Sequence, residues 1–533
     1  MKHSLFLILL FPLLNAYSQS TKEAKAKLAT PNIERTSYDV HHYHIDLDID
    51  IEDKAISGSV KMDFTLLNNT PKIGIDLDDK LTIDSITYLG KSLAFKRTPE
   101  SREVLITIDN RFKKEESYTI EIFYHGQPQE AIKAPWDGGV SWKKDKNNNP
   151  WIGVSCEGDG ASIWWPNKDL LSDEPDSVTF TCRYPKELFF VANGDMVTDI
   201  KYEGYRETTW KTTLPINNYN VTLNIADYTH IEEVFRREEN ASQLRLDYYV
   251  LSYNKDKATE HFKIVGPMMA IFENAFGEYP FEDDGYALVE TPYLGMEHQS
   301  AIAYGNQYKS GYLGRYPKHM DFDFIVIHET GHEWWGNSVS MNDRADMWIH
   351  ESFCTYSEAI FAEHYYGYDH MVDYLVYQKD FIENTSPIQG IPHQHKSGHG
   401  TDIYYKGSWV LHTLRNMVNN DELWNKMIKD LALKYRINNV DGKQVKTFIA
   451  EYLNMDLDAF FDVYFNSTAL PTIIIKEHKD GVKIKMAKKY GFSLPFNWNN
   501  TPVILSNKWV KIKKTNKEDV KKQLNRLFLI KQV

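Results

Sequence analysis

The hydrophobic pattern of this 533-residue chain changes its period part-way along, and that change constrains the fold more than any other feature. From residue 37 to about residue 228 apolar and polar residues alternate, as in residues 45–51, where aspartates separate isoleucines and a leucine. Such alternation is typical of strands with one buried face. After residue 253 apolar residues recur every three to four positions, which is typical of amphipathic helices. The chain is therefore expected to be an α+β protein of several domains.

The segments themselves give the expected domain order. Strands are expected over residues 59–67, 103–108, 118–124, 177–183 and 208–213, which predicts a β-sandwich-like domain over residues 19–230. Helices are expected over residues 256–275, 321–335, 343–366, 402–418, 421–435 and 442–453, within a second domain over residues 231–470. Alternation returns at residues 472–476, 482–486, 503–505 and 509–513, which predicts a small C-terminal β domain over residues 471–533.

The first 18 residues are interpreted as a secretory signal peptide. Lys2 supplies the positive end, residues 5–14 the apolar stretch, and residues 16–18 (Ala-Tyr-Ser) a small-x-small cleavage site. The alternative is a membrane anchor, but the apolar run is too short to span a bilayer and Pro12 interrupts it. No cysteine follows the run to carry a lipid. The protein is therefore expected to be secreted or periplasmic, with no integral membrane anchor.

Net charge bears on the possible partners of the chain, and cysteine content bears on its possible disulfides. The formal net charge is −13, so the chain as a whole repels nucleic acid, and no nucleic-acid partner is expected. The three cysteines, Cys156, Cys182 and Cys354, are too few for a disulfide framework. One pair, Cys156 with Cys182, is possible, and three free thiols are an equally good interpretation.

The segment His328-Glu329-Thr-Gly-His332 carries the strongest chemical signal. Residues four apart lie on one face of a helix, so His328 and His332 can direct a ring nitrogen at the same metal ion. Glu329, next to the first histidine, can reach a metal-bound water without binding the metal. Such a motif also arises by chance, so its surroundings decide.

Glu351 supplies the missing third ligand. Eighteen residues separate it from His332, and it lies in the helix expected over residues 343–366. A surface carboxylate is the alternative, but the apolar neighbours Trp348, Ile349 and Phe353 argue against it. Two imidazoles and one carboxylate leave the fourth position of a tetrahedral site open, which is typical of catalytic rather than structural zinc. The sequence therefore predicts one Zn²⁺ per chain.

With these residues in place, the chain resembles the zinc aminopeptidases typified by aminopeptidase N and leukotriene hydrolase. Their pattern is a helix with two histidines and a glutamate, followed after eighteen residues by the glutamate of an Asn-Glu-Gly-Phe-Ala-type segment. Here His350 stands for that asparagine, Ser352 for the glycine and Cys354 for the alanine, while the ligand position remains Glu351. The resemblance covers residues 36–470 and implies a saddle-like β domain followed by a thermolysin-like catalytic domain. The large helical C-terminal domain of many relatives is not expected here.

Two carboxylates upstream are candidates for binding the α-ammonium of a substrate. Gly295-Met296-Glu297 resembles part of the family's Gly-Ala-Met-Glu-Asn exopeptidase loop, in which the small residue lets the backbone pass close to substrate and the glutamate pairs with the amine. Glu157, nine residues before Pro166, matches a second family position. Its alternative role is a turn-forming acid on a glycine-rich loop.

The last candidate is a tyrosine at the start of a helix. Tyr404-Tyr405-Lys406-Gly407 resembles the family's Tyr-x-Lys-Gly, whose tyrosine donates a hydrogen bond to the developing oxyanion. The spacing selects Tyr404; Tyr405 is the competitor, with packing as its alternative role.

Together these features imply a secreted zinc-dependent aminopeptidase acting on peptides with a free N-terminus. Three alternatives remain at this point. A zinc endopeptidase on the same fold would not need Glu297. An epoxide-type hydrolase would need a narrow apolar channel. A catalytically silent zinc-containing peptide-binding protein would not need Glu329 or Tyr404.

Overall fold

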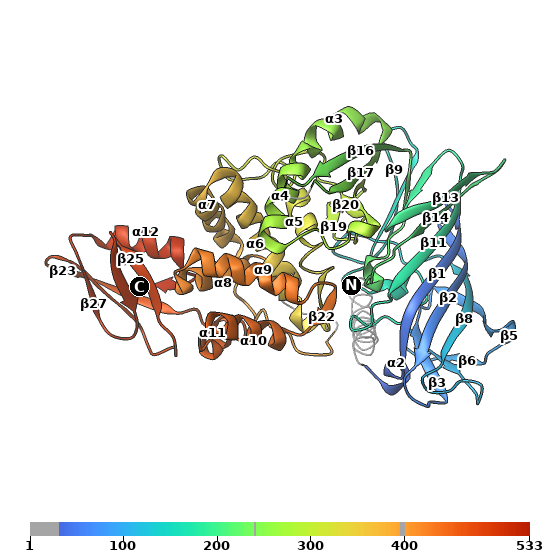
Figure 1. The fold of residues 1–533 in the computed structure, drawn as a ribbon, viewed down its shortest axis with the longest axis horizontal. Coiled ribbons are helices and arrows are strands. Elements are labelled where there is room, and N and C mark those ends of the chain that lie inside the picture. The colour runs from blue at the N-terminus through green and yellow to red at the C-terminus, as the bar shows by residue number, and fades with distance from the viewer. Residues whose placement is uncertain (1–30, 239–240, 395–399) are drawn as a thin grey trace, which may run out of the picture. The chain divides into compact units, whose positions relative to one another are not determined.

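The computed structural model describes residues 31–238, 241–394 and 400–533, so the predicted signal peptide lies outside the described residues. The chain forms two compact units, coloured along the sequence in Figure 1. The first, called the β unit here, comprises the described residues up to 261 together with 281–306 and 393–394. The second, the helical unit, comprises residues 262–280, 307–392 and 400–533.

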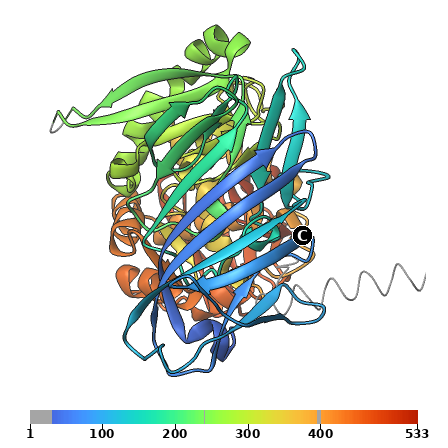
Figure 2. The same ribbon diagram turned by 90° about the vertical axis from the view of Figure 1, so that its right-hand side faces the viewer.

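The β unit is built on an eight-stranded sheet in the order β13-β14-β11-β1-β2-β8-β4-β5. Its strands are β1 (Tyr38–Asp50), β2 (Ala55–Leu66), β4 (Leu81–Tyr88), β5 (Lys91–Ser92), β8 (Ser117–Gly126), β11 (Ser177–Tyr184), β13 (Asp195–Lys201) and β14 (Arg206–Lys211). The long strands lie side by side in a twisted sheet (Figure 2). Along β1 the predicted alternation is present: Tyr43, Ile45 and Leu47 are fully buried in the core, and intervening residues face outward.

Smaller sheets complete this unit. They are β3-β7-β6, β12-β15-β10-β9 and β16-β17-β18-β20-β19. Their strands are β3 (Lys72–Asp76), β6 (Phe95–Arg97), β7 (Glu103–Thr107), β9 (Gly139–Lys144), β10 (Pro150–Ser155), β12 (Phe189–Val191), β15 (Asn224–Ala226), β16 (Tyr228–Arg236), β17 (Gln243–Leu251), β18 (Tyr286–Glu290), β19 (Gly295–Met296) and β20 (Ile302–Tyr304). The short helices are α2 (Ile33–Thr36), η1 (Ala161–Ile163), η2 (Asn218–Asn220), η3 (Ser252–Asn254), α3 (Lys255–His261) and η5 (Glu282–Asp284).

The helical unit is organised around the buried helix α6 (Trp348–Tyr366). Its helices are η4 (Phe262–Ile264), α4 (Val265–Phe276), α5 (Phe324–Gly331), η6 (Arg344–Asp346), α6 (Trp348–Tyr366), α7 (Tyr368–Gln378), η7 (Lys379–Phe381), η8 (Gly400–Ile403), α8 (Tyr405–Val418), α9 (Asp421–Lys434), α10 (Gly442–Leu453) and α11 (Asp458–Tyr464). The parallel pair β21 (Val339–Met341) and β22 (Asn438–Val440) joins two loops. Residues 348–362 of α6 are all buried, as expected for a helix packed on every side.

Residues 471–533 fold within the helical unit as strands and one helix. The strands are β23 (Thr472–His478), β24 (Gly481–Met486), β25 (Leu494–Trp498), β26 (Thr501–Leu505), β27 (Val510–Lys513) and β28 (Lys531–Gln532), in a four-stranded and a two-stranded sheet. The helix is α12 (Lys517–Leu527), at the red end of the colour range in Figure 1. The α+β prediction is therefore confirmed, with this C-terminal helix as an addition to the expected strands.

Individual helix boundaries differ from the expectation where local chemistry ends the helix. The helix expected over residues 321–335 is shorter, because Asp323 rather than Asp321 is its N-cap. After Gly331 the chain leaves the α-helical path, and the N–H groups of Trp334 and Trp335 both donate to the Gly331 carbonyl. Helices α7 and α11, which the apolar period did not predict, follow α6 and α10.

The structure also shows the state of the cysteines and the character of the helices. Cys156, Cys182 and Cys354 are all buried free thiols, so the possible Cys156–Cys182 pair does not form. Within the part of the chain that the structure describes, none of the helices has both the length and the apolar character needed to cross a bilayer.

Candidate active site

Helix α5 brings the two predicted histidine ligands together. The Asp323 carboxylate accepts hydrogen bonds from the N–H groups of Ile325 and Val326 and so fixes the start of the helix. His328 and His332 follow one turn apart, joined by a hydrogen bond from the His332 N–H to the His328 carbonyl. Their Nε2 atoms lie 3.2 Å apart, and both side chains are buried. The two ring nitrogens therefore converge on one point.

Glu351, in the first turn of α6, completes this cluster. Its Oε2 lies 3.4 Å from His328 Nε2 and 3.6 Å from His332 Nε2. Ligand atoms bound tetrahedrally to zinc at ~2.0–2.1 Å are about 3.3 Å from one another, so these separations fit a zinc ion. Although buried, Glu351 Oε2 accepts no protein hydrogen bond from the described residues. These three residues therefore fit the ligand set of a Zn²⁺ site.

The other ring nitrogens of the histidines are held in place by acceptors. His328 Nδ1 lies 2.7 Å from Glu358 Oε1, and His332 Nδ1 lies 2.9 Å from the carbonyl oxygen of Trp335. Each acceptor keeps a hydrogen on Nδ1, which leaves the Nε2 lone pair for the metal. Glu358 also accepts hydrogen bonds from the hydroxyls of Tyr312 and Tyr374. Glu358 was not predicted, although its position two helical turns after Glu351 is a usable signal.

The electrostatics of the cluster favour a positive charge. Burial alone would lower the pKa of His328, but the neighbouring carboxylates of Glu351 and Glu358 outweigh burial and raise that pKa to about 10. Burial alone would likewise raise the pKa of Glu351, and its interactions with His328 and His332 hold it well below the usual range. The two shifts have the same cause: the buried Glu351 carboxylate favours a cation beside it, which is the charge that a divalent metal ion supplies.

Because Glu358 Oε1 lies 2.7 Å from Nδ1 of the candidate ligand His328, Glu358→Ala is expected to weaken zinc binding roughly 10- to 100-fold. Competition with a chelator of known affinity measures the change. Glu358→Gln keeps an acceptor oxygen for the Nδ1 hydrogen and is the matched control, expected to lose less. Equal zinc affinity in Glu358→Ala and the unmodified protein would show that Glu358 does not orient His328.

The predicted base and tyrosine lie in the same unit. Glu329 follows His328 in α5 and is buried. Tyr404 is the residue before α8, and the centroid of its ring lies 6.0 Å from that of His328. Tyr405 instead packs against Phe381, with ring centroids 5.2 Å apart. Of the two neighbouring tyrosines, Tyr404 is therefore the one whose ring lies beside the candidate ligand His328.

The remaining predicted residues lie in the β unit. Gly295 and Met296 form β19, which pairs with β20 through Tyr304 and Ala303. Glu297 directly follows this strand and is buried, with 4% of its surface exposed. A short strand within a sheet thus fixes the backbone from which the Glu297 carboxylate projects.

Tyr219 in η2 lies close to both candidate carboxylates. Its hydroxyl donates to Glu297 Oε1 at 3.2 Å, and Cys156 Sγ, next to Glu157 in the turn after β10, donates to the Tyr219 carbonyl. Burial raises the pKa of Tyr219 well above its usual value, and the charges of Glu297 and Glu157 raise it further. The two glutamates therefore lie around one neutral phenol and together favour a cation. Tyr219 was not predicted, because 78 residues separate it from Glu297.

The residues that depart from the family pattern around Glu351 are part of the packed interior. His350 Nε2 accepts a hydrogen bond from the Met341 N–H, and Cys354 Sγ donates to the Trp335 carbonyl. The backbone of Gly336, at φ 137°, passes close to the rings of His332 and His350. A Cβ at Gly336 would lie 3.0 Å from His332 Nδ1 and 3.4 Å from the His350 ring. Only glycine fits this approach to a ligand.

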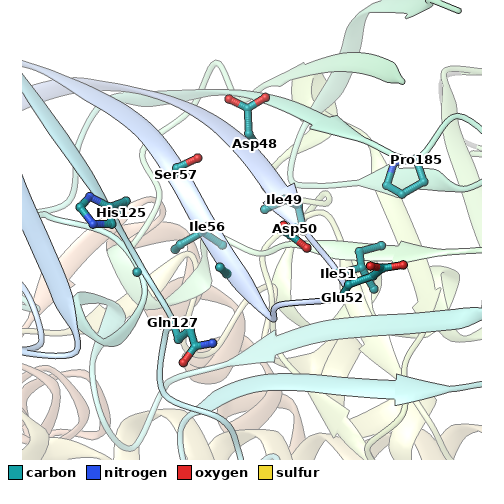
Figure 3. A pocket seen from close by; sticks show the side chains of 12 residues that line it. Asp48, Ile49, Asp50, Ile51, Glu52, Ile56, Ser57, His125, Gln127 and Pro185 are labelled. Carbon is teal, nitrogen blue, oxygen red and sulfur yellow. The ribbon is translucent and has the colours of Figure 1, made fainter. Parts of the chain in front are cut away.

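A separate hollow in the β unit contains none of the predicted site residues (Figure 3). It has a volume of about 650 Å³ and lies along β1, β2 and the end of β8. Its polar lining includes Asp48, Asp50, Glu52 and His125. Asp48 is paired with Arg183, and the hollow is an acidic feature of the surface of the β unit.

The fold and the convergent His328, His332 and Glu351 define a zinc protein of the metallopeptidase class. Family models agree: the Peptidase M1 N-terminal domain matches residues 39–219 and the Peptidase family M1 domain matches residues 261–464. The chain belongs to peptidase family M1.

Individual relatives are distant. The chain is 23% identical to the alanine/arginine aminopeptidase of Saccharomyces cerevisiae over 58% of its own length and 38% of the relative's. It is 30% identical to aminopeptidase Q of Felis catus over 30% of its own length and 16% of the relative's. The chain thus spans well under half of these relatives. A solved M1 zinc metallopeptidase from Deinococcus radiodurans has the same fold, with a TM-score of 0.68 at 18% identity, covering 82% of this chain and 95% of that one.

Proposed function

We propose that this protein is a zinc-dependent aminopeptidase that hydrolyses the N-terminal peptide bond of peptides. The observation that carries the proposal is the convergence of His328, His332 and Glu351 with spacings that fit tetrahedral zinc. Membership of a family whose listed relatives are named aminopeptidases supports the reaction type.

Each of the candidate residues has a separate role in the proposed reaction. Bound zinc supplies a Lewis acid that polarises the scissile carbonyl and brings the pKa of a water towards ~7. Glu329 accepts a proton from the attacking water and delivers it to the nitrogen of the leaving amine. The Tyr404 hydroxyl donates a hydrogen bond to the oxygen on which negative charge develops. Glu358 and the Trp335 carbonyl keep the two imidazoles oriented throughout.

The assignment to N-terminal cleavage rests on the carboxylates of the β unit. We assign Glu297, assisted by Glu157, to the α-ammonium of the substrate, with Gly295 and Met296 as the backbone alongside it. Tyr219 donates to Glu297 and restrains its carboxylate. An acylated N-terminus would leave the buried Glu297 without its cation, so such substrates should be disfavoured.

Glu297→Ala is therefore expected to raise KM for peptides with a free N-terminus and to reduce the preference over their N-acetylated counterparts. A charge-assisted hydrogen bond to a buried group contributes about 1.5–3 kcal/mol, which is roughly ten- to a hundredfold in affinity. Steady-state kinetics on matched free and acetylated peptides measure both effects.

Two further variants sharpen the test. Glu297→Gln keeps the side-chain volume without the charge and should behave like Glu297→Ala. Glu203→Ala removes an exposed carboxylate of the same unit and should leave KM unchanged. Undiminished discrimination in both Glu297 variants would remove Glu297 from the substrate site.

Export is the second part of the proposal and rests on the first 18 residues. Their charged start, apolar stretch and small-x-small end support cleavage before Gln19 and release from the cytoplasm. Terminal sequencing of protein recovered from outside the cytoplasm tests this. Recovery of an intact Met1 terminus from the cytoplasm alone would contradict it.

A further inference from the structure

Ser352 links the helix that carries the third ligand to the segment that carries Tyr404. It follows Glu351 in the first turns of α6 and is buried, with 1% of its surface exposed. Its hydroxyl donates to the carbonyl oxygen of Ile403 at 2.7 Å. Ile403 ends η8 and directly precedes Tyr404, so this hydrogen bond holds the peptide group from which Tyr404 extends.

The packing around this bond is close. Gly407, in the first turn of α8, approaches Ser352 so nearly that a Cβ on Gly407 would lie 1.8 Å from Ser352 Oγ. Any side chain at residue 407 would displace the hydroxyl, so the presence of Ser352 requires glycine at this position. The first turn of α8 therefore packs in direct contact with the turn of α6 that carries Glu351.

Other contacts hold the same segment from its far side. The Asp402 carboxylate accepts hydrogen bonds from the N–H groups of Glu383 and Asn384, both at 3.0 Å. Lys406 Nζ donates to the Ser467 carbonyl at 2.9 Å. Neither of these contacts reaches the α6 turn, and Ser352 provides the hydrogen bond between that turn and the residue preceding Tyr404.

We propose that Ser352 is a positioning residue, whose hydroxyl fixes the Tyr404 phenol relative to the metal ligands. Ser352 occupies the position at which the family pattern has glycine, so this hydrogen bond belongs to the particular sequence of this chain. The inference rests on the proposed role of Tyr404 in stabilising the oxyanion. A small displacement of a preorganised donor reduces the stabilisation of the transition state more than it changes substrate binding.

A double-mutant cycle tests the inference. Ser352→Ala should lower kcat roughly three- to tenfold with little change in KM, as expected for the loss of one hydrogen bond that acts through a catalytic donor. In a Tyr404→Phe background, Ser352→Ala should produce no further loss, because the hydroxyl that it positions is already absent. Ser357→Ala is the matched control, since Ser357 is also buried on α6 but donates to the Phe353 carbonyl within its own helix.

Hydrogen exchange in the metal-free protein gives a readout that does not depend on activity. Amides of residues 403–409 should exchange faster in Ser352→Ala than in Ser357→Ala. Equal kcat losses in both backgrounds, or unchanged exchange over this segment, would overturn the positioning role alone. Full kcat in Tyr404→Phe itself would overturn the oxyanion role and the inference with it.

Discussion

Glu329→Gln is expected to retain stoichiometric zinc and the native melting temperature while kcat falls by about 10²- to 10⁴-fold. The amide is nearly the same size as the carboxylate, so the buried site keeps its packing. It cannot accept the proton of the attacking water, and the reaction loses its general base. Elemental analysis of the purified variant, thermal unfolding and steady-state kinetics together measure the three quantities.

A neighbouring glutamate provides the control for this substitution. Glu333 is also buried and lies four residues further along, where it accepts a hydrogen bond from the Tyr279 hydroxyl at 3.0 Å. Glu333→Gln keeps an acceptor for that hydroxyl and should retain most of the activity. If Glu329→Gln lost zinc together with activity, Glu329 would have a structural role instead of a chemical one.

Glu351→Ala is expected to lose the metal and, with it, essentially all activity. The substitution removes one of three ligands and leaves two imidazoles whose Nε2 atoms lie 3.2 Å apart. Two neutral imidazoles do not provide the charge or the geometry of the triad, so zinc should be far below one equivalent after purification.

A histidine of the same helix serves as its control. His364 is exposed in the last turn of α6, and its Nδ1 donates to the Ile360 carbonyl of the same helix at 2.9 Å. His364→Ala should keep one zinc per chain. Stoichiometric zinc in Glu351→Ala would remove Glu351 from the ligand set.

Local periodicity accounts for the features that the sequence could predict. His328 and His332 are four residues apart, so helix geometry alone places both rings on one face. The alternating residues 45–51 give the buried face of β1 for the same kind of reason. Tyr404 was expected from the resemblance of Tyr404-Tyr405-Lys406-Gly407 to the family's Tyr-x-Lys-Gly, and its ring lies beside His328.

Long-range contacts account for what could not be predicted. Tyr219 meets Glu297 only because η2 and β19 come together in the folded β unit. The hydrogen bond from Ser352 to Ile403 joins residues 51 positions apart, so no local sequence pattern predicts it. Helix α12 is a different case, because Val520, Leu524 and Leu527 have helical spacing. The expectation of strands alone over residues 471–533 missed this usable signal.

The most direct test of the central claim compares one peptide with a free N-terminus and its N-acetylated form, using the unmodified protein. The account predicts stepwise loss of single residues from the free peptide, seen by mass spectrometry, and little or no cleavage of the acetylated one. A chelator should abolish the cleavage and added Zn²⁺ should restore it. Internal cleavage of both peptides at similar rates, or cleavage that persists after the metal is removed, would contradict the assignment of a zinc aminopeptidase.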